Sequence, residues 1–388
     1  MKYKEFSFAV VAGTAALVAC ATDSGFDDLN VERADAGEDA LAANDGGGDA
    51  AATGDARADS DAQRPLVCGD AGYCETQLPL SDLGEPLSLS GIWAVSPNDV
   101  WSVALEGYVL HWDGTSWRID YKIGHALHTV WATKNSVWIG GDLGTLLRRS
   151  SDGTWNVVES GHTATIRSIG GTDDDDVWFT SRDGTVDHFD GTAVTNHSLG
   201  APVVLTTVFG DAAGGMYAAG YVGLGIVAHP ALDRPYAYRL SAAGATPFNT
   251  AFPEQQGFVP TAGAVVSTSE EEPRLLLAGY RLEEYVKLEI YPTVSVSHYE
   301  KLEPGVGLVI TDTPSFPRPP LSLYARNRGD VYMAYSIFDI IHWDGSAPSK
   351  SSLDMGQSYL PRPIAGIHGS GGDIWIIGDG FALKGSAL

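Results

Sequence analysis

The sequence predicts an all-β protein built from one four-stranded unit that is repeated seven times, and three observations support this prediction. An apolar strand, a polar turn and a second strand recur along the chain. Asp-Gly pairs separate further alternating strands, and such pairs indicate hairpins because both residues tolerate positive φ. The first units follow one another at a nearly constant spacing of about 39 residues, a period that is typical of propeller blades. We therefore expect a seven-bladed β-propeller of antiparallel blades.

The first strand of each unit carries an apolar residue at one recurring position. These residues are Ile92, Val130, Ile169, Val208, Val265, Leu323 and Ile367. The aromatic residue or Leu of the second strand follows this position closely, as in Asp176-Val177-Trp178. The wider gaps on either side of Val265 indicate an insertion in each of two units.

Two further strands complete a unit. Tyr108-Val109-Leu110-His111-Trp112 precedes Asp113-Gly114, after which Trp117-Arg118-Ile119 starts a fourth strand. The seventh unit stops at its third strand, Phe381-Ala382-Leu383-Lys384. Along the sequence, the fourth strand precedes the first strand of the next unit by a nearly constant number of residues. Counting the same number back from the first unit leads to Thr76-Gln77-Leu78-Pro79-Leu80. We therefore expect an N-terminal strand to complete the last blade and close the ring, which removes exposed sheet edges.

Residues 76–388 resemble the Asp-box (sialidase-type) and related propeller repeats of secreted bacterial proteins. Ser150-Ser151-Asp152-Gly153-Thr154-Trp155 comes nearest to the Asp-box pattern. The resemblance implies a propeller fold. Sialidase activity would also require a Phe/Tyr-Arg-Ile-Pro motif, three convergent arginines and a Tyr-Glu pair. No such motif occurs, and Phe316-Pro317-Arg318-Pro319 is only a superficial likeness.

Residues 1–19 are predicted to be a lipoprotein signal peptide. Lys2 and Lys4 precede an apolar run from Phe6 to Ala19, which is too short to span a bilayer as a helix. Leu17-Val18-Ala19-Cys20 resembles the lipobox of bacterial lipoproteins. That family implies cleavage before Cys20 and acylation of this residue, and Ala21 in place of Asp favours the outer membrane. The alternatives are an ordinary signal peptide with a chance Cys, or a cytosolic chain with an apolar start.

Residues 20–64 are predicted to be the lipidated Cys and a disordered acidic tether. Ala, Gly and Asp occupy 28 of the 44 positions between residues 21 and 64, which hold 12 acids and 3 Arg. Such a composition buries too little apolar area to offset its ordering entropy. In residues 65–75, Cys68 and Cys74 are predicted to form a disulfide, since an exported chain enters an oxidising compartment. A metal-binding pair is the alternative.

Charge and motifs exclude several functions. The chain has 24 Lys and Arg against 49 Asp and Glu, a net charge of −25, which opposes nucleic-acid binding. No Gly-x-Ser-x-Gly, His-Glu-x-x-His or phosphate-loop motif occurs, and no cofactor or metal is predicted. His111, His188 and His342 share one strand position in three different units, where we expect packing between blades. The tryptophans also fall at repeat positions and are expected in the core.

Loops supply the candidate binding residues. The segments 240–262, 303–320 and 350–363 are expected to connect neighbouring blades on the usual binding face. Turns between second and third strands place acids around one mouth of the channel, namely Glu106, Asp142, Asp183, Glu284, Asp339 and Asp379. This acidic rim is predicted to bind a basic protein segment or a cation. The alternative is ordinary polar turns in an acidic chain.

These observations predict a monomeric cell-envelope binding or scaffold module, held at the outer membrane by its lipid on the periplasmic or cell-surface side. The ligand would be a protein or a glycan. We favour binding over catalysis. Two alternatives stay open: a carbohydrate-active enzyme of glycosidase or lyase type, whose carboxylate spacing is a three-dimensional property, and an outer-membrane assembly factor.

Overall fold

The computed structural model describes residues 67–69, 71–181, 184–197, 199, 203–211, 215–222, 235–247, 258–268, 271–283, 293–303, 306–312, 320–327, 329–335, 339–346, 348–353 and 363–386. All of them belong to one compact unit, Gln63–Leu388. The predicted signal peptide, Cys20 and the acidic tether lie outside the described residues. The described part of the chain contains no helix with the length and hydropathy of a membrane span.

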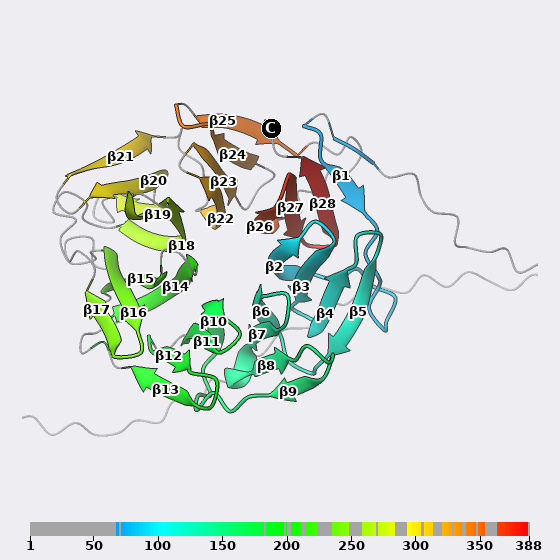
Figure 1. Ribbon diagram of the computed structural model, residues 1–388. Helices are drawn as coiled ribbons and strands as arrows, with labels where there is room; N and C mark the ends of the chain where they lie inside the picture. Colours follow the sequence, from blue (N-terminus) through cyan, green and yellow to red (C-terminus); the bar gives the residue numbers. More distant parts are fainter. Residues whose placement is uncertain are drawn as a thin grey trace, which may run out of the picture. The chain divides into compact units, whose positions relative to one another are not determined.

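The fold is an all-β propeller of four-stranded antiparallel blades, and the described strands form seven such sheets (Figure 1). Sheet 1 contains β2 (Leu89–Ser96), β3 (Asp99–Ala104), β4 (Tyr108–Trp112) and β5 (Trp117–Lys122). Sheet 2 contains β6 (Leu127–Ala132), β7 (Val137–Gly141), β8 (Leu146–Arg149) and β9 (Trp155–Val157), with the short 3-10 turn η1 (Asp142–Gly144). Sheet 3 contains β10 (Ile166–Asp173), β11 (Asp176–Ser181), β12 (Val186–Phe189) and β13 (Val194–His197).

The remaining sheets follow in chain order. Sheet 4 contains β14 (Val203–Asp211), β15 (Gly215–Val222), β16 (Pro235–Ser241) and β17 (Gly244–Pro247). Sheet 5 contains β18 (Phe258–Thr268), β19 (Glu271–Glu283), β20 (Thr293–Glu303) and β21 (Val306–Asp312). Sheet 6 contains β22 (Pro320–Asn327), β23 (Asp330–Tyr335), β24 (Asp339–Trp343) and β25 (Pro348–Ser352). Sheet 7 contains β26 (Ile364–Ser370), β27 (Asp373–Gly378), β28 (Phe381–Ser386) and β1 (Cys74–Thr76).

The expected loop insertions are partly strands. β17 lies within 240–262, β21 within 303–320, and the end of β25 within 350–363. Each segment therefore contains all or part of the fourth strand of sheet 4, 5 or 6. Residues 248–257, 313–319 and 354–362 lie outside the described residues.

The strand that joins the last sheet precedes the first sheet in the chain, and it lies earlier than expected. β1 pairs antiparallel with β28, with Cys74 opposite Lys384 and Thr76 opposite Ala382. The sequence predicted this strand at residues 76–80. Pro79 lacks the N–H that a ladder needs, and Leu78 instead packs beside the core shared by sheets 1 and 7.

The first strand of each sheet lies against the first strand of the next sheet, and β26 also lies against β2. Every first strand carries a β-bulge at the same register position. The bulged residues are Ser90, His128, Arg167, Thr206, Thr261, Leu321 and Ala365. A bulge re-aims the side chain that it carries, and all seven residues line a small central channel.

The bulges also correct the repeat register in sheet 5. The recurring apolar residue lies two positions after the bulge, as Ile92 follows Ser90. In sheet 5 this position is Gly263, so the prediction of Val265 was wrong by two positions. The ring of Phe209 fills the space, because a Cβ on Gly263 would lie 2.4 Å from it. The apolar volume therefore comes from the neighbouring sheet.

The core consists of apolar clusters between adjacent sheets. Trp138, Trp178 and Trp375 are fully buried, as expected for tryptophans at repeat positions. Trp112, Trp117 and Trp375 meet where sheets 1 and 7 face each other, with ring centroids 5.1 to 5.8 Å apart. Trp117 Nε1 also donates a hydrogen bond of 3.0 Å to Thr76 Oγ1 in β1.

The predicted disulfide between Cys68 and Cys74 is present. Tyr73, beside the second cysteine, is buried in the cluster shared by sheets 6 and 7. Burial, together with nearby Tyr332, raises the pKa of Tyr73 to about 12. The disulfide loop is therefore fixed to the core by a large side chain.

Candidate functional site

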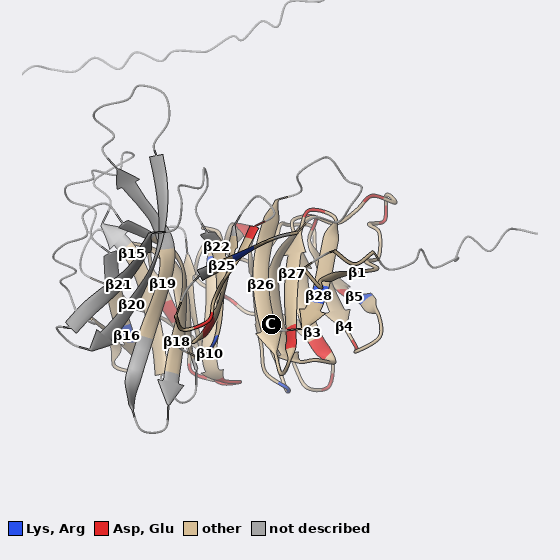
Figure 2. Ribbon diagram, turned by 90° about the horizontal axis from the view of Figure 1, so that it is seen from above, with Lys and Arg blue, Asp and Glu red and all other residues tan. Residues whose placement is uncertain are grey.

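We define the loop face as the end of the sheets that holds the turns between second and third strands and the connections between sheets. Figure 2 shows acidic residues at both ends of the described sheets. Acidity alone therefore does not distinguish the loop face. The position and partners of each predicted rim residue decide what it contributes.

Two predicted rim acids meet at the border of sheets 1 and 7. The backbone N–H of Ser88 donates to both carboxylate oxygens of Glu106, at 3.2 and 3.1 Å. The hydroxyl of Ser88 donates to Asp379 Oδ1 at 3.0 Å. The structure thus brings Glu106 and Asp379 together, and both are exposed.

The other rim acids are placed differently. Asp339 is only 15% exposed and pairs with Lys350 at 2.8 Å within sheet 6. Asp183 and Glu284 lie outside the described residues. Gly141 of sheet 2 and Ala104 of sheet 1 are equivalent in strand register. Asp142 is therefore equivalent to Leu105, the first residue of the sheet 1 turn. The expected one-to-one match of Asp142 with Glu106 was therefore wrong by one position.

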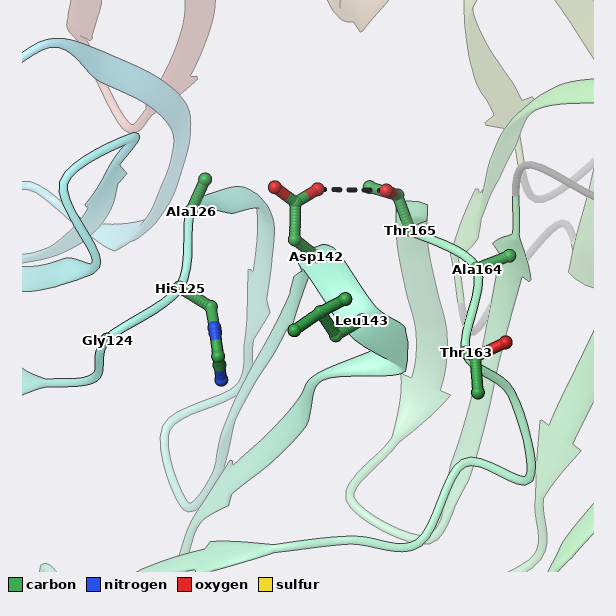
Figure 3. Close-up of a pocket in the computed structure, with 8 residues that line it drawn as sticks. All are labelled: Gly124, His125, Ala126, Asp142, Leu143, Thr163, Ala164 and Thr165. Carbon is green, nitrogen blue, oxygen red and sulfur yellow. Dashed lines mark hydrogen bonds between the residues drawn. The ribbon is translucent and has the colours of Figure 1, made fainter. Parts of the chain in front are cut away.

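A pocket of about 770 Å³ opens on the loop face beside Asp142 (Figure 3). It lies between the connection from sheet 1 to sheet 2 and the connection from sheet 2 to sheet 3. Its lining consists of Gly124, His125, Ala126, Asp142, Leu143, Thr163, Ala164 and Thr165. A concave site built from three loops on a rigid sheet scaffold is the usual form of a binding site.

Asp142 is the anionic group of this pocket. Its Oδ1 accepts hydrogen bonds from His128 Nε2 and from the Thr165 hydroxyl, both at 2.8 Å. The hydrogen bond from His128 comes first among the causes that lower the pKa of Asp142, and nearby Arg167 adds to it. The carboxylate is therefore ionised across the physiological range.

Leu143 is a functional candidate that the sequence did not reveal. Its side chain is 65% exposed, and it is the one non-glycine residue with positive φ, at 58°, in the described ranges. Such a conformation is unfavourable for Leu, and strained residues cluster at functional sites. A pattern of polar turn residues does not reveal backbone strain. The one sequence signal was the order Asp-Leu-Gly in the sheet 2 turn, where the sheet 1 turn has Leu-Glu-Gly.

Two aromatic side chains, Trp93 and His368, line the central channel. The rings of Trp93 and His368 lie 4.2 Å apart, and Tyr324 lies 5.0 Å from His368. The N–H of Ala94 donates to His368 Nδ1 at 3.0 Å. Desolvation by burial lowers the pKa of His368 to about 3.

We therefore expect His368 to weaken the fold in acid. An unfolded histidine titrates near pH 6.5. Between about pH 6.5 and pH 3 the unfolded chain binds a proton that the folded chain excludes, so stability falls as pH falls. Because one histidine binds at most one proton, the slope cannot exceed about 1.4 kcal/mol per pH unit. Urea unfolding of the wild type and of His368→Gln at several pH values measures it. A parallel pH dependence of the two proteins would contradict the prediction.

The three repeated histidines lie toward the opposite end of the sheets, each with the same partners. His111, His188 and His342 bond through Nε2 to Asp99, Asp176 and Asp330, at 2.9, 2.7 and 2.8 Å. Each ring also stacks on the aromatic residue opposite it in the neighbouring strand, 4.1 to 4.3 Å away. Among the described residues, no three His, Cys, Asp or Glu side chains are grouped as metal ligands.

Comparison with known proteins places the fold. No family model and no curated protein matches the sequence. A catalytically inactive virginiamycin B lyase from Staphylococcus aureus, with quinupristin, is similar in structure, with a TM-score of 0.59, 11% identity, and coverage of 81% of this chain and 99% of that one. YCF48 bound to D1 peptide is similar with a TM-score of 0.57 and 14% identity, over 83% of this chain and 99% of that one. The WD40 β-propeller domain of Doa1 is similar with a TM-score of 0.56 and 14% identity, over 81% of this chain and 96% of that one. At these identities the likeness establishes a β-propeller and nothing finer.

Proposed function

We propose that this protein is a lipid-anchored β-propeller of the cell envelope that binds a partner protein through its loop face. The proposal takes the seven sheets as seven blades in a ring that β1 closes. The pairing of β1 with β28 and the contact of β26 with β2 support this arrangement. The lipobox-like Leu17-Val18-Ala19-Cys20 supports the anchor. The disulfide supports an oxidising compartment such as the periplasm or the cell surface.

The observation that carries the binding function is the pocket beside Asp142. It is formed by connections and a turn, so its shape depends on loops while its position depends on sheets 1 to 3. The YCF48 structure shows that a propeller of the same architecture is bound to a peptide. A peptide segment of a partner protein is therefore the ligand that we favour over a glycan, since the pocket lining has no aromatic side chain except the imidazole of His125.

Photo-cross-linking in cells tests this function directly. A photoreactive amino acid at Thr163, which is exposed and lines the pocket, should give discrete adducts with an envelope protein. The same residue at Lys134, exposed at the opposite end of the sheets, is the matched control. Equal adducts from both positions, or none from Thr163, would mean that the loop face is not the binding face.

Neutralising the exposed rim acids should weaken binding of the cross-linked partner by about tenfold, if each exposed charge contributes roughly 0.5 kcal/mol. The variant combines Glu106→Gln, Asp142→Asn and Asp379→Asn. It should also flatten the dependence of affinity on salt, because fewer charges remain to be screened. The control is Asp339→Asn, since Asp339 is mostly buried and paired with Lys350. The affinity for the partner is measured at two salt concentrations. If the variant kept the affinity and the salt dependence of the wild type, the rim acids would have no role in binding.

A second candidate function is catalysis, as a carbohydrate-active enzyme of glycosidase or lyase type. The observation that favours it is the contact of Asp142 with His128, because a carboxylate that orients an imidazole is a common acid–base arrangement. Turnover of envelope glycans by the purified chain, lost in Asp142→Asn, would support it. Copurification with outer-membrane assembly machinery would instead support the assembly-factor alternative.

A further inference from the structure

The turn beside the pocket has an unusual order of residues. In sheet 1 the turn is Leu105-Glu106-Gly107, and no residue before its glycine has positive φ. In sheet 2 the equivalent turn is Asp142-Leu143-Gly144, with φ of 58° at Leu143 and 69° at Gly144. Asp tolerates this left-handed conformation better than Leu. The sheet 2 turn therefore places its apolar residue at the position where it is least favourable.

Neighbouring loops hold this turn in place from both sides. The N–H of Asp142 donates to the carbonyl of Ala126 at 2.9 Å. The hydroxyl of Ser160 donates to the carbonyl of Gly144 at 2.7 Å. A Cβ on Gly144 would lie 1.9 Å from the carbonyl oxygen of His162, so only glycine fits there. The surroundings thus fix Leu143 in its strained and exposed position at the edge of the pocket.

The carboxylate of Asp142 keeps one oxygen for a ligand. Both hydrogen bonds to this group end on Oδ1, and Oδ2 has no hydrogen-bond partner in the described part of the chain. Figure 3 shows the two oxygens diverging, with only one directed at Thr165. Arg167 lies along the channel wall and is not part of the pocket lining. The pocket therefore offers one fixed negative charge next to one exposed apolar side chain.

We infer that this pocket binds the side chain of a lysine or arginine in a segment of the partner protein, with the methylene stem on Leu143 and the cationic end at Asp142 Oδ2. This inference rests on the proposed function, for which it names the chemistry of the contact. A long cationic side chain is the residue type that presents an apolar stem and a charged end together. Leu143 at the edge of the pocket matches the apolar stem, and the carboxylate of Asp142 at its wall matches the cationic end.

Three peptides separate the parts of this inference. They are acetylated and amidated Gly-Ser-Gly-X-Gly-Ser-Gly sequences in which X is lysine, norleucine or glutamate. The purified chain, with labelled leucine methyl groups, is titrated with each peptide and followed by NMR. We expect the lysine peptide to shift the Leu143 methyl signals saturably and to lose affinity at higher salt. The Leu105 signals, which report an exposed leucine in the equivalent turn of sheet 1, should not shift.

Two variants complete the test. Leu143→Asn should bind the lysine peptide at least about fivefold more weakly, and its melting temperature should equal or exceed that of the wild type because Asn tolerates positive φ. Asp142→Asn should lose affinity to a similar extent, while Leu105→Asn should change nothing. Equal binding of the norleucine or glutamate peptide, or unchanged binding by Leu143→Asn, would overturn the inference. If Thr163 cross-links its partner as strongly in the Leu143→Asn background as in the wild type, the inference fails while the proposed function stands.

Discussion

Removing residues 1–88 should destabilise the propeller by more than about 5 kcal/mol, whereas removing residues 1–64 should leave its stability nearly unchanged. The longer deletion removes β1 and exposes the edge of β28. It also removes Tyr73 and Leu87, which are 2% and 0% exposed. Loss of one large core side chain costs about 2 to 5 kcal/mol, and a domain is stable by only about 5 to 15 kcal/mol in total.

The contacts of Thr76 increase this expected loss. Thr76 accepts from Trp117 Nε1 and donates to the carbonyl of Ala382 at 2.9 Å, so it links sheets 1 and 7. Without it, the indole N–H of Trp117 loses its partner within a tryptophan cluster, and unpaired buried donors are costly. Urea unfolding of the two truncated chains measures the difference. Tyr73→Ala in the full chain, expected to cost about 3 to 5 kcal/mol, checks the same interface without truncation. Equal stability of the two truncated chains would show that β1 is not part of the closing sheet.

The sequence pattern predicted the sheets well but misplaced single residues. An apolar period specifies which face of a strand is buried, and it tolerates a shift of two positions, because both registers point to the same side. This is why Val265 matched the pattern while Gly263 holds the position. The strand that pairs with β28, expected within residues 76–80 and found at Cys74–Thr76, is a second case. It was anchored by a cysteine pair that the spacing of apolar residues did not include.

The candidate site was predictable only in its charged part. Acids in turns are visible in a sequence, and Glu106, Asp142 and Asp379 were predicted on the loop face, where their turns lie. The exposed and strained Leu143 was not predictable, because leucine is normally a core residue. Its exposure depends on Ala126, Ser160 and His162, which belong to two different connections. Local rules fail where the wider structure imposes a conformation, and such places are often functional.

The two ends of the sheets differ in how their polar groups are used. At the end opposite the loop face, a histidine or cation lies over the second-strand aromatic and near an acid in several sheets. In sheet 2 Arg148 lies over Trp138, and in sheet 7 Lys384 lies over Trp375 and pairs with Asp373 at 2.9 Å. These side chains pack against one another, although Trp138 Nε1, Trp375 Nε1 and Arg148 Nε are buried without a hydrogen-bond partner among the described residues. The loop face differs in placing Asp142 and the exposed Leu143 beside an open pocket, which is why we propose binding there.

Replacement of Cys20 by Ser should release the protein from membranes, with the largest effect of any single substitution proposed for this chain. Leu17-Val18-Ala19-Cys20 resembles a lipobox, and the resemblance implies cleavage before Cys20 and acylation of its thiol and its new amine. Each buried CH₂ of an acyl chain contributes about 0.8 kcal/mol to membrane binding, and stable anchoring requires more than one chain. Loss of acylation should therefore move nearly all of the protein into the soluble fraction.

The chain supplies its own control for this substitution. Cys68→Ser with Cys74→Ser removes the other two cysteines, which are joined in a disulfide. That double variant should lose roughly 2 kcal/mol of its free energy of unfolding, because the disulfide restricts the unfolded chain. It should nevertheless stay in the membrane fraction and incorporate labelled fatty acid. Fractionation and labelling of both variants give the answer. Membrane retention of Cys20→Ser, together with no fatty acid in the wild type, would refute the lipid anchor, whereas the pocket beside Asp142 would still be open to the same binding tests in a soluble protein.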